Sequence, residues 1–281
     1  MCRMKGFTLI ELLVSITIIG ILASMLLPAV EDARMKAFQV SCMSNLRALG
    51  VAFTLYADEN DDVFVPAAED VNWGNDNCRR WHGVRPATDQ PFDHSKGPLA
   101  RYAGGEAYRC PAFWGYQTSV ALNAFEAGCG GYGYNQTFVG TLEWKLSPHW
   151  FTGNTYSIRR GAGWSDFMKP PETLVFADCA LPMISGEEQY LVEYSFAEPP
   201  FWTEPAPNGL WDQPDTDNPW GRPSPSIHFR HNNEANVLWL DMHVTGMPFG
   251  YTTETNVYGA ENKPFKVGWF EPDDFTYFDQ K

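Results

Sequence analysis

The chain has 281 residues, of which 34 are acidic and 20 basic, so its formal net charge is −14. A hydrophobic content of 44% excludes a chain that is disordered by composition. The acidic balance argues against nucleic-acid binding, because a phosphate backbone requires clustered Lys and Arg. The length allows one large domain or two small ones.

Apolar residues are concentrated near the N-terminus. Residues 7–30 contain a single charged side chain, Glu11. An apolar stretch of about 20 residues is long enough to cross a bilayer as a helix. Arg3 and Lys5 precede the stretch and acidic residues follow it, so the positive-inside rule predicts a cytoplasmic N-terminus.

Glu11 is the unusual residue of this segment. An ordinary secretory signal peptide shares the basic start, but its apolar region spans only about 7–15 residues and does not explain a carboxylate. At the centre of a membrane helix a carboxylate costs roughly 2.5–3.5 kcal/mol, so it is retained with a partner. If the chain were cut after Gly6, the new amine of Phe7 would lie about one helical turn from Glu11. That amine could pair with Glu11 within one chain or between neighbouring chains.

The run Gly6-Phe7-Thr8-Leu9-Ile10-Glu11 resembles the processing site of type IV prepilins and type II secretion pseudopilins. The resemblance implies that a prepilin peptidase cuts between Gly6 and Phe7 and methylates the new N-terminal Phe7. It also implies that Glu11 neutralises the amine of a neighbouring subunit during assembly. Pro28 falls where helices of this family commonly carry a proline, which kinks or locally melts them, and a proline also removes one backbone N–H.

Residues 31–57 are predicted to continue the helix as an amphipathic stem. Leu46, Leu49, Phe53 and Tyr56 recur at spacings of three, four and three, which defines one face of a helix. A solvent-exposed coiled coil is the weaker alternative, since the apolar repeat covers barely two heptads. The acidic residues 58–62 end the helix, and their spacing fits an EF-hand loop poorly, so a solvated linker is favoured over a calcium site.

The rest of the chain is predicted to be loop-rich, with short strands. Residues 63–135 are rich in Pro, Gly and Trp, and residues 199–225 contain too many helix breakers to form a helix. Strands are expected over residues 173–178, 189–194 and 235–240, which are rich in β-branched or aromatic side chains.

His231 and Asp241 lie near the C-terminus with nine residues between them. This spacing resembles the C-terminal signature of a large pilin-like family, in which His, nine residues and Asp-Gly close the domain. Here Met242 stands in place of the Gly, which weakens the idea that the turn needs a positive φ. We predict a structural His231–Asp241 hydrogen bond that joins two turns.

A metal or hydrolytic site is the alternative for this segment, which also contains His228 and His243. These residue types are suitable zinc ligands. Alternation along a strand would scatter them, and no nucleophile or HExxH pattern accompanies them. We therefore expect no catalytic residue, no metal and no cofactor here.

Five cysteines remain after the first six residues, so at least one is free or paired between subunits. An extracytoplasmic domain permits disulfides. We expect Cys42 to pair with Cys78 or Cys110 and so tie the stem to the first loop. Buried thiols without any disulfide are nearly as well supported.

The pilin resemblance implies an α+β fold in which a long N-terminal helix, both membrane anchor and stem, packs on a small antiparallel sheet with large loop insertions. We expect a cleaved leader over residues 1–6, the helix over 7–57 and an extracytoplasmic globular head over 58–281. The chain would be a non-enzymatic filament subunit of a type IV pilus or a secretion pseudopilus. Its partners would be prepilin peptidase, copies of itself or other pilins, and the inner membrane before assembly, without nucleic acid.

Two alternatives to a purely structural role remain. A carbohydrate-binding adhesin on the same stem is suggested by 11 Trp and 12 Tyr, since exposed aromatic rings suit sugar stacking. Exposed Trp clustered on one face would favour the adhesin, whereas buried Trp would favour a scaffold. A membrane-anchored hydrolase would need a pocket with convergent titratable groups, which the sequence offers only around His231.

Overall fold

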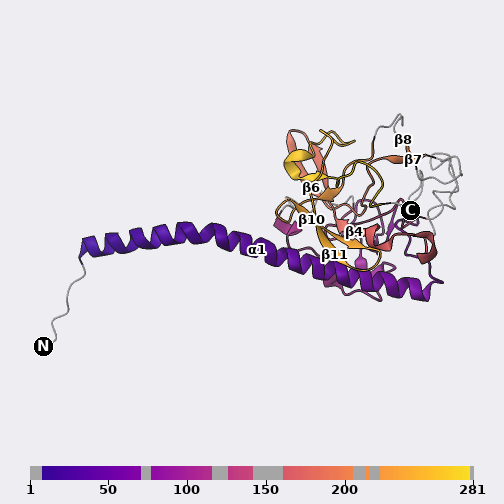
Figure 1. Ribbon diagram of the computed structural model, residues 1–281, viewed down its shortest axis with the longest axis horizontal. Coiled ribbons are helices and arrows are strands. Elements are labelled where there is room, and N and C mark those ends of the chain that lie inside the picture. Colours follow the sequence, from indigo (N-terminus) through magenta and orange to yellow (C-terminus); the bar gives the residue numbers. More distant parts are fainter. Residues whose placement is uncertain are drawn as a thin grey trace.

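The computed structural model describes residues 8–70, 77–115, 126–141, 161–204, 213–215 and 222–278. One helix, α1 (Leu9–Glu59), is 51 residues long. Its C-terminal half lies against the remainder of the chain, and its N-terminal half projects away alone (Figure 1). We call the described residues that follow α1 the head.

A four-stranded antiparallel sheet of order β11-β10-β4-β3 packs on α1. Its strands are β3 (Tyr132–Tyr134), β4 (Leu174–Asp178), β10 (Glu234–Trp239) and β11 (Val244–Pro248). β4 and β10 are almost wholly buried, which their continuous apolar composition favours. The α+β fold class expected from the sequence is confirmed.

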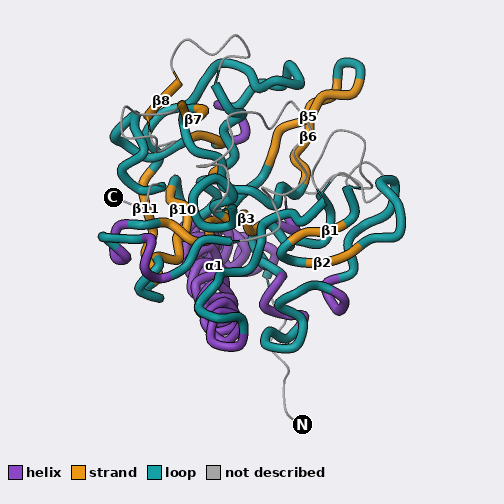
Figure 2. Tube along the Cα trace, turned by 90° about the vertical axis from the view of Figure 1, so that its right-hand side faces the viewer, coloured by secondary structure: helices purple, strands orange, loops and turns teal. Residues whose placement is uncertain are grey.

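Smaller two-stranded sheets surround this sheet, and loops make up much of the head (Figure 2). They comprise β1 (Arg79–Arg80) with β2 (Gly83–Val84), β5 (Leu181–Ser185) with β6 (Glu188–Val192), β7 (Trp202–Glu204) with β8 (Gln213–Asp215), and β9 (Ile227–His228) with β12 (Val267–Gly268).

The three predicted strands are confirmed as β4, β6 and β10, with ends displaced by one or two residues. The described parts of residues 199–225 contain strand and irregular backbone, as the breakers predicted. Short 3₁₀ helices add single turns at residues 94–96, 105–108, 113–115, 164–166, 170–172 and 263–265.

The predicted apolar stripe of α1 enters the main core of the head. Leu46, Leu49 and Phe53 are fully buried, and Tyr56 packs at the edge of the same cluster. Phe53 contacts the ring of Phe176 on β4 at 6.2 Å between centroids. Burying a large apolar side chain contributes about 1.5–3 kcal/mol, so this stripe accounts for why the head packs on this half of α1.

Met242 forms the turn between β10 and β11 with a φ of +71°. The turn therefore has the left-handed conformation that Gly usually supplies. The presence of Met242 was taken to weaken the idea of a positive φ here, and that interpretation was wrong. The Met242 side chain lies against α1, where the Thr54 hydroxyl is 3.4 Å from its sulfur. This contact with the helix gives a reason for Met at a position where a β-carbon is strained.

Candidate functional site

The N-terminal half of α1 exposes a long apolar surface. Its large aliphatic side chains are between 51% and 81% exposed, and they are Leu9, Ile10, Leu12, Leu13, Val14, Ile16, Ile18, Ile19, Ile21, Leu22, Met25, Leu26, Leu27 and Val30. We call residues 9–30 of α1 the bare stem. α1 is long and apolar enough to cross a membrane. An exposed apolar surface of this extent requires lipid or other apolar helices around it.

Glu11 closes the first turn of the bare stem. Its Oε2 accepts hydrogen bonds from the Thr8 backbone N–H at 2.9 Å and from the Thr8 hydroxyl at 2.8 Å. The Glu11 N–H donates to Thr8 Oγ1 at 3.3 Å, which completes a capping box. The carboxylate is therefore held at the helix start and turned toward the chain's N-terminal end. Gly6 and Phe7, the residues of the expected cleavage site, lie outside the described residues.

Pro28 lies inside α1 without interrupting it. The helix is continuous from Leu9 to Glu59 and curves gently along its length (Figure 1). The bend is therefore spread over the whole helix, and the helix does not melt locally at Pro28.

Cys42 of α1 forms a disulfide with Cys110 of the loop that follows η2 (Gly105–Tyr108), with their Cα atoms 5.1 Å apart. This is one of the two pairings that the sequence left open. Cys78 and the buried Cys129 and Cys179 take part in no disulfide among the described residues. Asn45, one turn after Cys42, donates to the Arg109 carbonyl at 2.6 Å. The stem and the head are thus joined by a covalent bond and a neighbouring hydrogen bond.

Three buried ionisable side chains, Asp178, Arg230 and His231, lie next to this disulfide, with His231 Nε2 3.9 Å from Cys110 Sγ. Asp178, at the end of β4, accepts from Arg230 Nη2 at 2.6 Å and lies 3.2 Å from His231 Nε2. The Asn236 N–H also donates to Asp178 at 2.8 Å. The side chains of all three ionisable residues are fully buried.

Two opposing effects act on the Asp178 carboxyl group. Burial raises its pKa, but the Arg230 charge, the interactions with His231 and the Asn236 N–H lower the pKa more, so that it lies below its usual range. Asp178 is therefore ionised and balances the Arg230 guanidinium in the core.

The predicted His231–Asp241 hydrogen bond is wrong. His231 pairs with Asp178, and Asp241 pairs with His243 on an exposed turn. The six-residue strand β10 separates His231 from Asp241, and at about 3.3 Å per residue it places them roughly 20 Å apart. The sequence offered a signal for the true partner, since Asp178 is the charged last residue of a strand that is otherwise apolar.

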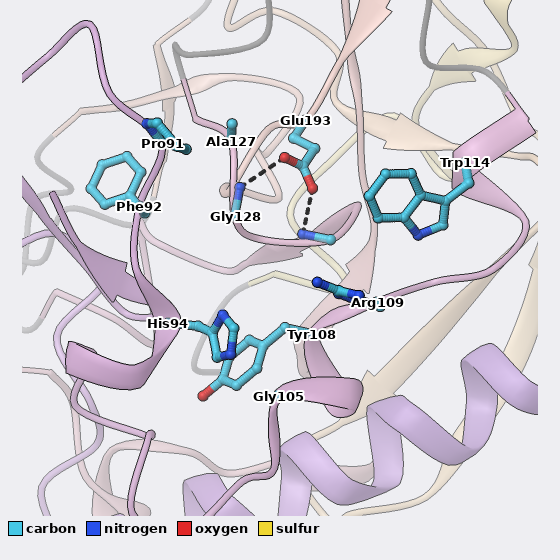
Figure 3. A pocket seen from close by; sticks show the side chains of 11 residues that line it. Pro91, Phe92, His94, Gly105, Tyr108, Arg109, Trp114, Ala127, Gly128 and Glu193 are labelled. Atoms are coloured by element: carbon cyan, nitrogen blue, oxygen red, sulfur yellow. Dashed lines mark hydrogen bonds between the residues drawn. The ribbon is translucent and has the colours of Figure 1, made fainter. Parts of the chain in front are cut away.

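A pocket of about 210 Å³ opens on the head near β6 (Figure 3). Glu193 lies at its wall and accepts from the N–H groups of Gly128 and Gly130, both at 2.7 Å. Gly130 has a φ of +67°, and a β-carbon there would lie 1.2 Å from the Tyr108 carbonyl oxygen, so only Gly fits. Trp114 also lines the pocket, and the Arg109 guanidinium lies 5.9 Å from its ring centroid.

The tryptophans distinguish the two roles considered for the head. Of the six Trp residues in the described part of the chain, Trp114 alone is exposed, at 53%. Trp81, Trp239 and Trp269 are buried, and Trp164 and Trp202 are half-buried. In the described residues, aromatic rings therefore mainly fill the core of a loop-rich head.

Comparison with known proteins connects the N-terminal segment with a known motif. Residues 1–27 match the family model described as the prokaryotic N-terminal methylation motif. The chain is 41% identical over 59 residues to type II secretion system core protein G of Aeromonas hydrophila, and 40% identical over 60 residues to the Klebsiella pneumoniae protein of the same name.

These alignments cover 21% of this chain and 41% and 43% of the two relatives, so the chain spans about two fifths of the length of the curated relatives it matches. No solved structure matches the chain significantly. The methylation motif and the similarity to core protein G support a type IV pilin-like protein, and the long apolar helix packed on a small antiparallel sheet agrees with such a fold.

Proposed function

We propose that the chain is a structural subunit of a type IV pilus-like or type II secretion pseudopilus filament. The observation that carries the proposal is the division of α1 into a bare apolar half and a half covered by the head. Before assembly, the bare stem would be buried in the inner membrane with its N-terminus in the cytoplasm. In the filament, the same surface would be buried against the stems of other subunits.

Processing by prepilin peptidase prepares the chain for assembly. The peptidase cuts between Gly6 and Phe7, releases residues 1–6 and methylates Phe7. The mature chain then consists of the helical stem over residues 7–57 and a head over 58–281. The match of residues 1–27 to the methylation motif supports this step.

Glu11 and Pro28 act in assembly. The capping box holds the Glu11 carboxylate at the end of the stem, where the new amine of a neighbouring subunit can pair with it. Pairing removes the cost of an unpartnered carboxylate among apolar helices. Pro28 removes one helical hydrogen-bond donor from the bare stem and so makes bending easier at that level.

An adhesin or carbohydrate-binding module on the same stem has less support. The pocket beside Trp114 is the one feature of the described head that favours it. The similarity to pseudopilins and the burial of the other described Trp residues favour a scaffold instead.

Co-expression with a prepilin peptidase tests the processing step directly. Mass spectrometry of the N-terminal peptide should find a chain that begins at Phe7 and carries one added methyl group. A Gly6→Leu variant should keep the leader, because it replaces the Gly after which the peptidase is proposed to cut. An uncut wild-type chain in the presence of an active peptidase would contradict the proposal.

A further inference from the structure

One group of metal-ligating side chains stands out among the residues that the structure describes. Cys42, Cys110 and His231 are all buried, and one potential ligand atom from each lies within 4.8 Å of the others. They come from α1, from the loop after η2 and from the turn that precedes β10. The group therefore joins the stem to two separate parts of the head.

We propose that this group binds a zinc ion, Zn²⁺, before the Cys42–Cys110 disulfide forms. The newly made chain contains thiols, and two thiolates with one imidazole are a common ligand set for zinc. A fourth position is left for water or another donor.

The geometry supports one shared ion. Cys110 Sγ lies 3.9 Å from His231 Nε2. Two ligands of a tetrahedral ion with bonds of about 2.0–2.3 Å are separated by about 3.5 Å, so this pair needs to move by only a few tenths of an ångström. Without the disulfide, the two sulfur atoms are free to separate to the same spacing.

The surroundings permit His231 to act as a ligand. Asp178, its present partner, also accepts from Arg230 and from the Asn236 N–H, so it stays partnered when His231 Nε2 turns to a metal. The remaining ring nitrogen, Nδ1, is buried and has no hydrogen-bond partner in the described structure. In the metal-bound state Nδ1 carries the ring proton, and Nε2 presents its lone pair to the ion.

Charge balance also supports the site. Two thiolates and a divalent cation sum to zero, and a neutral imidazole adds nothing. The neighbouring Asp178 and Arg230 cancel each other. The metal-bound state thus brings no net charge into the core, where an unbalanced charge would be costly.

The conversion to the disulfide is a balanced step. Metal binding releases two protons from the two thiols. A disulfide oxidant, such as glutathione disulfide, later takes two electrons from the two thiolates and two protons from solvent. It becomes two thiols while the Cys42–Cys110 bond forms and the ion leaves. The metal thus holds stem and head in register until the covalent bond replaces it.

Cell-free synthesis of the full chain into detergent micelles tests this inference. One reaction contains zinc sulfate with a phosphine reductant, and a parallel one contains zinc sulfate with glutathione disulfide. After gel filtration, mass spectrometry of the metal content should find about one zinc per reduced chain and less than about a tenth of that per oxidised chain. Cobalt in place of zinc should give the thiolate charge-transfer band and the visible bands of a tetrahedral site.

Two variants assign the ligands. His231→Gln should lower the zinc content or affinity of the reduced chain at least about tenfold, because it removes a ligand. Cys78→Ser should leave the zinc content unchanged, because Cys78 lies outside the group. A reduced wild-type chain without zinc overturns the inference whether or not the variants fold. Full retention of zinc by a folded His231→Gln chain also overturns it.

Discussion

Asp178 carries a fully buried negative charge inside the head. Replacing it by Asn leaves the fully buried Arg230 guanidinium without its counter-charge. Removing one partner of a buried ion pair costs about 3–5 kcal/mol. We expect Asp178→Asn to lower the free energy of unfolding by that amount in urea titrations of the detergent-solubilised chain, followed by Trp fluorescence.

Asp241→Asn is the matched control for this prediction. Asp241 and His243 are 35% and 42% exposed at their side chains, and exposed ion pairs contribute about 1 kcal/mol or less. We expect a correspondingly small change. Equal losses in the two variants would contradict the assignment of Asp178 as the buried counter-charge of Arg230.

His82 makes the head sensitive to acid. It is fully buried, and neither ring nitrogen has a hydrogen-bond partner in the described structure. Burial lowers the pKa of His82 well below its usual value, and the nearby Arg80 and Arg85 lower it further. Below about pH 6.5 the unfolded chain therefore binds a proton at His82 that the folded chain excludes, and stability falls as the pH falls.

Comparison with His82→Phe isolates this effect from other titrating groups. As the pH falls from about 6.5 to 5, the wild-type chain should lose stability faster than His82→Phe, with the difference in slope rising to about 1.4 kcal/mol per pH unit. Urea titrations at several pH values measure the difference. Parallel pH profiles for the two chains would show that His82 titrates alike in the folded and unfolded states.

At the residue scale, the sequence predicted local features better than distant partners. The Cys42–Cys110 bond was one of two expected pairings. The apolar run around Glu11 predicted that this residue lies in a helix, and Glu11 is in the first turn of α1. The partner of His231 was missed because Asp178 lies 53 positions away and reaches it only through the pairing of β4 with β10. The Glu193 contacts were missed for the same reason.

At the element scale, periodicity and composition located α1 and the three strands β4, β6 and β10. These signals are local, since they depend on spacing within a single element. The sheet order β11-β10-β4-β3 was not predictable, because it depends on contacts between distant segments. Strands of two or three residues, such as β3 and β9, carry too few side chains to give a periodic signal.

The contact between α1 and β10 depends on Gly50. A β-carbon at this position would lie 3.0 Å from Leu238 Cδ2 and 3.2 Å from the Met242 sulfur. We expect Gly50→Val to overpack this contact and to lower the free energy of unfolding by about 1–3 kcal/mol. Urea titrations of the full chain measure this loss.

Gly20→Val places the same substitution on the bare stem of the same helix. No atom lies within 4 Å of a β-carbon at Gly20. The free energy of unfolding of the head should therefore stay within about 0.5 kcal/mol of the wild-type value. A similar loss in both variants would mean that valine acts through helix propensity rather than through the packing of α1 on the sheet.

At the scale of the whole molecule, the chain joins two surfaces of opposite character. The bare stem has one charged residue among its apolar side chains, Glu11, while the acidic excess belongs to the head. Loss of Arg3 and Lys5 with the leader would make the mature chain still more acidic than the full sequence, whose net charge is −14. A charged head keeps an assembled filament soluble, while its stems are buried.

The amount of chain recovered in sheared filaments, relative to the amount in the membrane fraction, tests the central proposal most directly. Wild-type chain co-expressed with its peptidase and assembly machinery should appear in the filaments. Glu11→Val should remain in the membrane and fall at least about tenfold in the filaments, because the neighbouring amine loses its partner. Glu31→Val, which removes an exposed acid beyond the apolar segment, should assemble like the wild type. Filament yields for Glu11→Val equal to those of the wild type, or no wild-type chain in the filaments, would contradict the account.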